Sequence, residues 1–130
     1  MSAFVDTNVL VRHLTGDPPK MAAKATAFLD STPGLLLVDL VVAETVYVLE
    51  TFFEAPRGQI ADAIRALIAF RSVVTVDPAL LLRAVEVYET ARLDFAEAYL
   101  VANAESTGVN KVASFDKTID RVGTVERVEP

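Results

Sequence analysis

The sequence predicts an α/β fold with three layers, in which helices cover both faces of a central, mainly parallel sheet. Short apolar segments alternate with longer amphipathic segments, and this pattern is typical of parallel strands joined by helices. The chain has 130 residues, which suits one domain with a substantial core and is too few for two. Its proline and glycine breaks are short, so we expect a single domain over residues 1–130.

Five short segments have the composition of strands. Residues 35–38 are wholly apolar, as expected for a parallel strand covered on both faces, and residues 73–76 are all β-branched. The remaining strands are predicted at 3–5, at 111–115 and, as an edge strand, at 124–128.

Six segments repeat apolar residues at helical spacing. They are 8–14, 20–30, 40–54, 57–71, 79–92 and 94–107. Asp39 is a predicted N-cap, and Gly108 is predicted to end the last helix. In the helix over 40–54, an apolar stripe from Val42 to Phe53 is predicted to face the core.

Composition excludes several classes of site. The formal net charge of −6 argues against a simple basic clamp for nucleic acid, and it permits nucleic-acid chemistry only where metal ions offset a local cluster of acids. The absence of cysteine excludes disulfides, zinc–thiolate sites and cysteine catalysis. His13 is the one histidine, so a His-rich zinc site within one chain is excluded too.

Hydrophobicity is high, at 52% of residues, so we expect some apolar surface to be covered by a partner or a second copy. No apolar run reaches the ~18 residues of a membrane span. The first residues include Asp6 and Asn8 and show no basic leader. We therefore expect a cytoplasmic location and no membrane partner.

Five acids lie at the junctions or first turns of the predicted elements. Asp6 follows the first strand, and Asp116 follows the fourth. Glu44 is early in the helix after the second strand, and Asp94 and Glu97 open the helix before the fourth. Because the carboxyl ends of parallel strands meet at one edge of a sheet, we expect Asp6 and Asp116 to be neighbours, with the other three leaning in from helix N-terminal turns.

Each acid also has a structural interpretation. Asp116 alone is most simply a helix N-cap, residues 94–97 (D-F-A-E) match a capping box, and Glu44 fits a solvated helix face. As a set, however, crowded carboxylates destabilise one another unless a cation lies between them, and oxygen-only ligands favour Mg²⁺ or Mn²⁺. The set therefore predicts metal-assisted phosphodiester hydrolysis by a metal-activated water.

Four segments resemble, in order, the motifs of PIN domains. Residues 4–10 (F-V-D-T-N-V-L) resemble the motif D-[ST]-[NS] after a strand, and residues 41–44 resemble a helical glutamate motif. Residues 93–102 are similar to an acid followed by A-x-[IL]-x-A, and residues 112–117 to a strand ending in [TS]-x-D. Each motif is weak singly, but together they span nearly the whole chain.

This resemblance implies the PIN fold and a Mg²⁺- or Mn²⁺-dependent endoribonuclease. The length is similar to that of stand-alone PIN proteins that act as VapC-type toxins of VapBC toxin–antitoxin modules. The resemblance thus also implies an RNA substrate, inhibition by a cognate VapB-type antitoxin, and a homodimer.

Carried over by position, the catalytic and metal-binding acids are Asp6, Glu44, Glu97 and Asp116. The third motif more often has Asp directly before the alanine, so Glu97 is a departure, and Asp94 is a further candidate for the metal ligand there. The resemblance gives supporting roles, such as orienting the acids or a metal-bound water, to Thr7, Asn8 and Ser114.

Two other functions are compatible with these residues. One is a non-catalytic PIN-fold domain that binds RNA or protein for regulation. The other is phosphatase chemistry with Asp6 as nucleophile, which is disfavoured because Asn8 stands where a second acid is wanted. We expect partner surfaces on residues 35–53 and 79–93, and RNA contacts from basic residues near the first and last motifs, namely Arg12, Lys20, Lys24 and Lys117.

Overall fold

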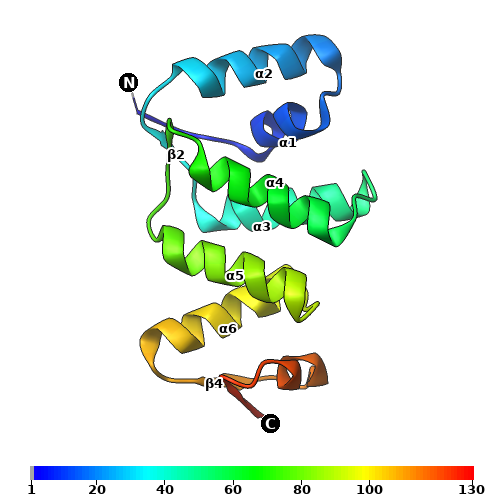
Figure 1. Cartoon of the computed structure of the whole chain (residues 1–130), viewed down its shortest axis with the longest axis vertical. Coiled ribbons are helices and arrows are strands. Elements are labelled where there is room, and N and C mark those ends of the chain that lie inside the picture. Colours follow the sequence, from blue (N-terminus) through cyan, green and yellow to red (C-terminus); the bar gives the residue numbers. More distant parts are fainter. Residues whose placement is uncertain (1) are drawn as a thin grey trace. The chain divides into compact units, whose positions relative to one another are not determined.

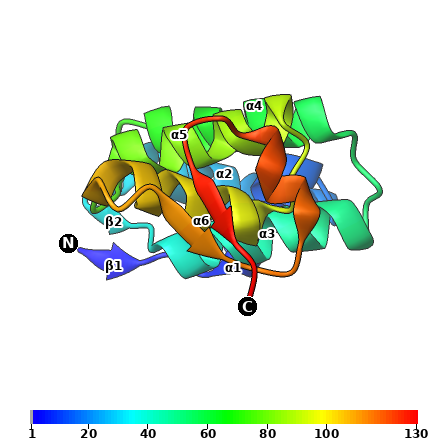
Figure 2. The same ribbon diagram turned by 90° about the horizontal axis from the view of Figure 1, so that it is seen from below.

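Strand pairing in the computed structural model, which describes residues 2–130, is parallel throughout. The chain divides into two compact units, Met1–Val76 and Asp77–Pro130, and each has its own sheet (Figures 1 and 2). The first sheet has the order β1-β2-β3, and the second pairs β4 with β5. The predicted class, a parallel α/β fold with flanking helices, is confirmed.

The first unit alternates strands with pairs of helices. Its elements are β1 (Ala3–Phe4), α1 (Thr7–Thr15), α2 (Pro19–Ser31), β2 (Leu35–Leu36), α3 (Asp39–Thr51), α4 (Arg57–Ala69) and β3 (Val73–Val74). The strands are shorter than predicted, but backbone pairing continues one residue further, because Val5 N donates to Leu36 O at 3.0 Å and Leu37 N to Val74 O at 2.9 Å. The ladder therefore ends immediately before Asp6.

Helix pairs enclose the core of the first unit. Figure 1 shows α1 beside α2 and α3 beside α4. The largest fully buried side chains there come from strands and helices alike: Leu10, Leu29, Leu35, Leu37, Val42, Ile60, Ile64 and Leu67. Each such side chain contributes about 1.5–3 kcal/mol of burial free energy. This core fixes the start of α1 and the first turns of α3, where two of the motif acids lie.

Two local predictions for α3 are wrong. Asp39 is the first helical residue, and Val38, with an extended backbone, is the N-cap. Val42 is buried as predicted, but Phe53 is 42% exposed. The reason is that α3 ends at Thr51, so Phe53 no longer follows the helical stripe.

The second unit consists of a helix pair followed by a small sheet. Its elements are α5 (Pro78–Thr90), α6 (Phe95–Thr107), β4 (Lys111–Ala113), the 3₁₀ helix η1 (Lys117–Arg121) and β5 (Glu126–Val128). Helices α5 and α6 pack through buried residues that include Leu81, Tyr88, Ala98 and Val101. As predicted, α6 ends at Gly108, whose φ of 76° suits glycine.

Strands β4 and β5 lie side by side, with Val112 opposite Arg127 (Figure 2). The edge strand is thus confirmed, whereas η1 between the two strands was not predicted. No helix among residues 2–130 combines the length and the apolarity that crossing a bilayer requires.

Candidate functional site

Asp6 follows the ladder of the first sheet and caps helix α1. Its backbone is extended, with φ −88° and ψ 156°, and its Oδ1 accepts a hydrogen bond from Thr7 N at 2.8 Å. This bond fixes the carboxylate at the helix N-terminus, where the helix dipole favours negative charge. The side chain remains exposed to solvent and available to a ligand.

A cavity of about 370 Å³ brings Asp6 together with Glu44 in the first unit. Glu44 is an exposed residue of α3 and has no ion pair among the described residues. Asn8 lines the same cavity, together with Thr7, Val11, Arg12, Asp17, Pro18, Val48 and Phe53. The first two motif acids and the polar pair Thr7–Asn8 therefore line one cavity of the first unit.

Thr7 is a buried polar residue of this cavity, with 5% of its surface exposed. Its Oγ1 has no hydrogen-bond partner among residues 2–130. An unpaired buried hydroxyl costs about 1–3 kcal/mol, so the oxygen is available to a water or a bound ligand. This is compatible with the supporting role predicted for Thr7.

Asp116 follows β4 and caps η1. Its Oδ1 accepts two hydrogen bonds from Thr118, one from the backbone N at 2.9 Å and one from Oγ1 at 2.7 Å. Ser114 Oγ in turn accepts from Asp116 N at 2.9 Å, so Ser114 shapes the turn rather than bonding the carboxylate directly. Hydrogen bonds from Thr118, then the one from Glu97, hold the pKa of Asp116 below its ordinary value.

Glu97, half-buried in the first turn of α6, shares a hydrogen bond with Asp116. Burial is the largest cause that raises the pKa of Glu97, followed by this hydrogen bond and by the negative charges of Asp116 and Asp94. The backbone N–H of Asp94 opposes the shift by donating to the Glu97 carboxylate. The second unit therefore brings two carboxyl groups into contact, and a shared proton or a bound cation would relieve their repulsion.

The capping-box interpretation of residues 94–97 is half right. Asp94 is the N-cap of α6, but its side chain accepts no hydrogen bond from the helix N-terminus. Glu97 supplies the reciprocal half of the box, because its carboxylate accepts a hydrogen bond from the Asp94 backbone N–H. The same carboxyl group also forms a hydrogen bond with Asp116. Of the two candidates for the third motif, Glu97 is the one in contact with Asp116, and Asp94 acts on it through charge.

These donors fit a hard divalent cation. All are oxygen atoms, and none of the five motif acids forms an ion pair with Lys or Arg among the described residues. Among residues 2–130, no group of three or more His, Cys, Asp or Glu side chains lies close enough together to hold a metal ion. Within the second unit, a cation bound by Glu97 and Asp116 would relieve the repulsion between these two carboxyl groups.

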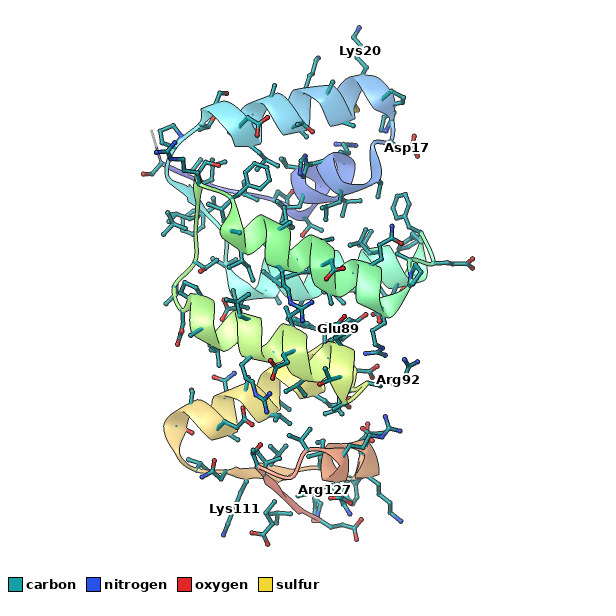
Figure 3. The ribbon with its side chains drawn as sticks, viewed as in Figure 1. Asp17, Lys20, Glu89, Arg92, Lys111 and Arg127 are labelled. Atoms are coloured by element: carbon teal, nitrogen blue, oxygen red, sulfur yellow. The ribbon has the colours of Figure 1, made fainter. Side chains whose placement is uncertain are left out.

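Basic side chains are few near these acids. Arg12 lines the cavity with Asp6, and it also lines a second cavity of about 370 Å³ with Lys24. Lys20 extends outward from the start of α2 (Figure 3), and Lys117 directly follows Asp116. Of the four bases expected to contact RNA, only Arg12 lines the same cavity as a motif acid.

Two residues near the acids were missed by sequence reasoning. Thr118 holds the Asp116 carboxylate through two bonds, and its signal was the spacing D-x-T, in which a threonine two residues on can bond an Asp side chain. Phe53 lines the cavity of Asp6 although it was assigned to the core. No local signal distinguished these alternatives for Phe53.

Comparison with known proteins identifies the family. No curated protein matches the chain in sequence. The family model of the PIN domain matches residues 3–125, which cover most of both units and all four motifs. With nearly the whole chain matched, this protein belongs to the PIN domain family, a family of nucleases.

Proposed function

We propose that this protein is a metal-dependent endoribonuclease that acts as the toxin of a type II toxin–antitoxin system. The observation that carries the proposal is the contact between Glu97 and Asp116, in which burial and a second carboxyl raise the pKa of Glu97. Two carboxyl groups in contact repel each other when both are ionised, and groups with perturbed pKa values cluster at functional sites. We infer that in this chain the pair binds a divalent cation.

The proposed ligands are Asp6, Glu44, Glu97 and Asp116, with Asp94 adding negative charge beside Glu97. When bound, the cation would neutralise the acids and activate a water for attack on the phosphodiester. Thr7 N and Thr118 hold Asp6 and Asp116 in fixed orientations. Thr7 Oγ1 and Asn8 offer polar atoms for an ordered water or the substrate.

Cleavage of a mixed RNA by the purified protein in Mn²⁺ tests this function. We expect products with the native protein, none in EDTA, and at least a ~100-fold loss in Asp6→Asn. Asp30→Asn is the matched control, because Asp30 is an exposed acid of α2 and should leave cleavage unchanged. Cleavage that persists in EDTA or in Asp6→Asn would contradict the proposal. RNA binding without any cleavage would favour the non-catalytic, regulatory alternative instead.

A cognate VapB-type antitoxin and self-association complete the proposal. Large apolar side chains of the region predicted as a partner surface are exposed on and after α3: Leu40 at 77%, Tyr47 at 59% and Phe52 at 73%. Exposed apolar groups of this size favour a protein partner. Light scattering should show a dimer, and co-expression with the product of the adjacent gene should give a stable complex that no longer cleaves RNA. A monodisperse monomer that does not bind that product would contradict this part.

A further inference from the structure

The cavity of Asp6 contains an arginine without a partner. Arg12, a half-buried residue of α1, forms no side-chain hydrogen bond or ion pair among residues 2–130. Three acids line the same cavity, Asp6, Asp17 and Glu44, and none of them pairs with it. A guanidinium held beside acids yet bonded to none is available for a phosphate group, which it binds through two parallel hydrogen bonds.

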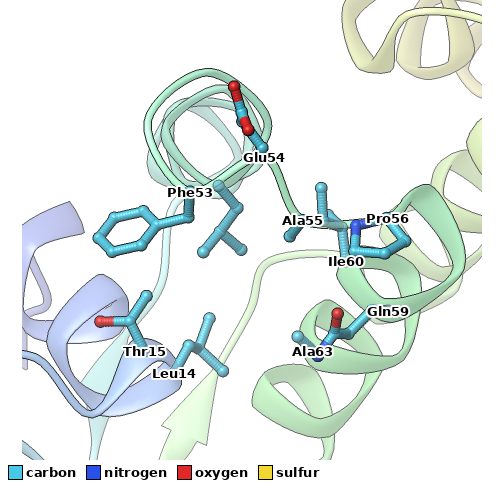
Figure 4. Close-up of a pocket in the computed structure, with 10 residues that line it drawn as sticks. Leu14, Thr15, Phe53, Glu54, Ala55, Pro56, Gln59, Ile60 and Ala63 are labelled. Carbon is cyan, nitrogen blue, oxygen red and sulfur yellow. The ribbon is translucent and has the colours of Figure 1, made fainter.

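An exposed aromatic ring lines the same cavity. Phe53 follows the end of α3, is 42% exposed, and also lines an adjoining cavity of about 360 Å³. Figure 4 shows its ring extending from the end of α3 toward Leu14 and Thr15 at the end of α1. A half-exposed phenyl ring offers a flat face, and nucleic-acid bases stack on such faces regardless of sequence.

The unpaired Thr7 hydroxyl is a separate indication that this cavity takes a polar ligand. Thr7 is nine-tenths buried or more, lines the cavity, and has no hydrogen-bond partner among the described residues. The volume of about 370 Å³ lies within the range of about 300–1,000 Å³ that is typical of small-ligand sites. Cation, aromatic face and free hydroxyl together match the phosphate, base and sugar of one nucleotide.

We propose that this cavity binds one nucleotide of the RNA, with Arg12 on a phosphate and Phe53 stacked on a base. The assignment rests on the proposed nuclease function, because it places this nucleotide next to Asp6 and Glu44. With three acids against one arginine, the cavity repels phosphate unless a divalent cation is bound, so RNA binding here requires the metal.

Binding of a short single-stranded RNA that contains 2-aminopurine tests the inference without relying on cleavage. With Ca²⁺ in place of Mg²⁺, and with the oligonucleotide confirmed intact afterwards, binding should quench 2-aminopurine fluorescence because the base stacks. Phe53→Leu should bind about tenfold more weakly and lose the quenching. Phe53→Trp should retain both, whereas a merely structural role for Phe53 would not produce rescue by another aromatic.

Arg12→Gln should also weaken binding by about tenfold. The slope of the logarithm of affinity against the logarithm of salt concentration should fall by roughly one, as expected for the loss of one phosphate contact. Phe4→Leu and Arg71→Gln are the matched controls, because both residues are exposed and neither lines this cavity, and they should bind like the native protein.

The outcomes separate this inference from the proposed function. Native-like binding by both Arg12→Gln and Phe53→Leu would overturn the inference even if Asp6→Asn abolishes cleavage. Binding that depends on Arg12 and Phe53 in a protein that never cleaves RNA would support the inference and refute the nuclease. Tight binding of a free 5′-mononucleotide, lost in Phe53→Leu, would assign the cavity to a free nucleotide and overturn its assignment to RNA.

Discussion

Helix α6 carries two glutamates whose surroundings have opposite effects. Glu105, near the end of the helix, accepts hydrogen bonds from Arg83 Nε and Nη2, both at 2.8 Å, and one from the Thr124 hydroxyl. The hydrogen bond from Arg83 is the largest cause that lowers the pKa of Glu105. Glu97, in the first turn, contacts Asp116 instead, and its pKa is raised.

The difference lies in the partner and not in the residue type. The charge of a carboxylate that accepts two hydrogen bonds from one guanidinium is balanced within the protein, so this carboxylate needs no bound cation. Two carboxyl groups in contact have no balancing charge within the protein, so a proton or a cation is needed to relieve their repulsion. Glu105 therefore joins α5 to α6 structurally, whereas Glu97 is available for chemistry.

The largest expected effect is on RNA cleavage. Glu97→Gln should lower kcat/KM by at least ~100-fold, because it removes a proposed ligand, whereas Glu105→Gln should stay within about twofold. Single-turnover cleavage of the same RNA by both folded variants measures this. Equal losses in the two variants would abolish the distinction between the two glutamates.

A second expected effect concerns metal binding in the absence of RNA. Mn²⁺ at about 100 times its dissociation constant should stabilise the native protein by about 2.7 kcal/mol, which is a rise of roughly 5–10 °C in Tm. Glu105→Gln should show the same rise, and Glu97→Gln should show little. Differential scanning fluorimetry with an EDTA control measures it, and an undiminished rise in Glu97→Gln would exclude Glu97 as a ligand.

A third effect separates the two glutamates by stability. Glu105→Gln should lower the free energy of unfolding by about 1 kcal/mol at pH 7, a modest loss because the Arg83 side chain is 35% exposed and solvent screens the pair. A lowered pKa adds stability above the ordinary value of about 4.5, and this stability is lost as pH falls through the lower folded value. Urea unfolding should thus show the native-to-variant difference shrinking from pH 5 downward, and a constant difference would refute the ion pair as its source.

The smallest effect extends the comparison to two buried threonines of the first unit. Thr45 Oγ1 donates to Val41 O at 2.7 Å, whereas Thr7 Oγ1 has no partner among the described residues. Thr45→Val should cost about 1 kcal/mol, and Thr7→Val should be neutral or stabilising. Denaturant unfolding measures both, and an equal loss in Thr7→Val would show that its hydroxyl is already satisfied.

Sequence alone predicted the parallel α/β class and the order of the elements, because apolar periodicity reports strands and helices directly. It placed Asp6 and Asp116 correctly after strands, since that position depends on local pattern. It did not predict η1 or the exposure of Phe53, because both depend on where a short element ends. The sequence did not decide whether Asp94 or Glu97 is the acid of the third motif. The pattern D-x-x-E is the same whether Glu97 bonds only the helix N-terminus or also contacts Asp116. The contact with Asp116 is made in space, and the local sequence does not reveal it.

An anomalous difference map of crystals soaked in Mn²⁺ tests the central claim most directly, because it locates the ion among the acids. We predict a peak whose ligands are motif acids, with Glu97 and Asp116 among them, and none at Glu105. A peak at Glu105 and Glu86, or no peak at any of the motif acids in crystals that bind Mn²⁺ elsewhere, would contradict it.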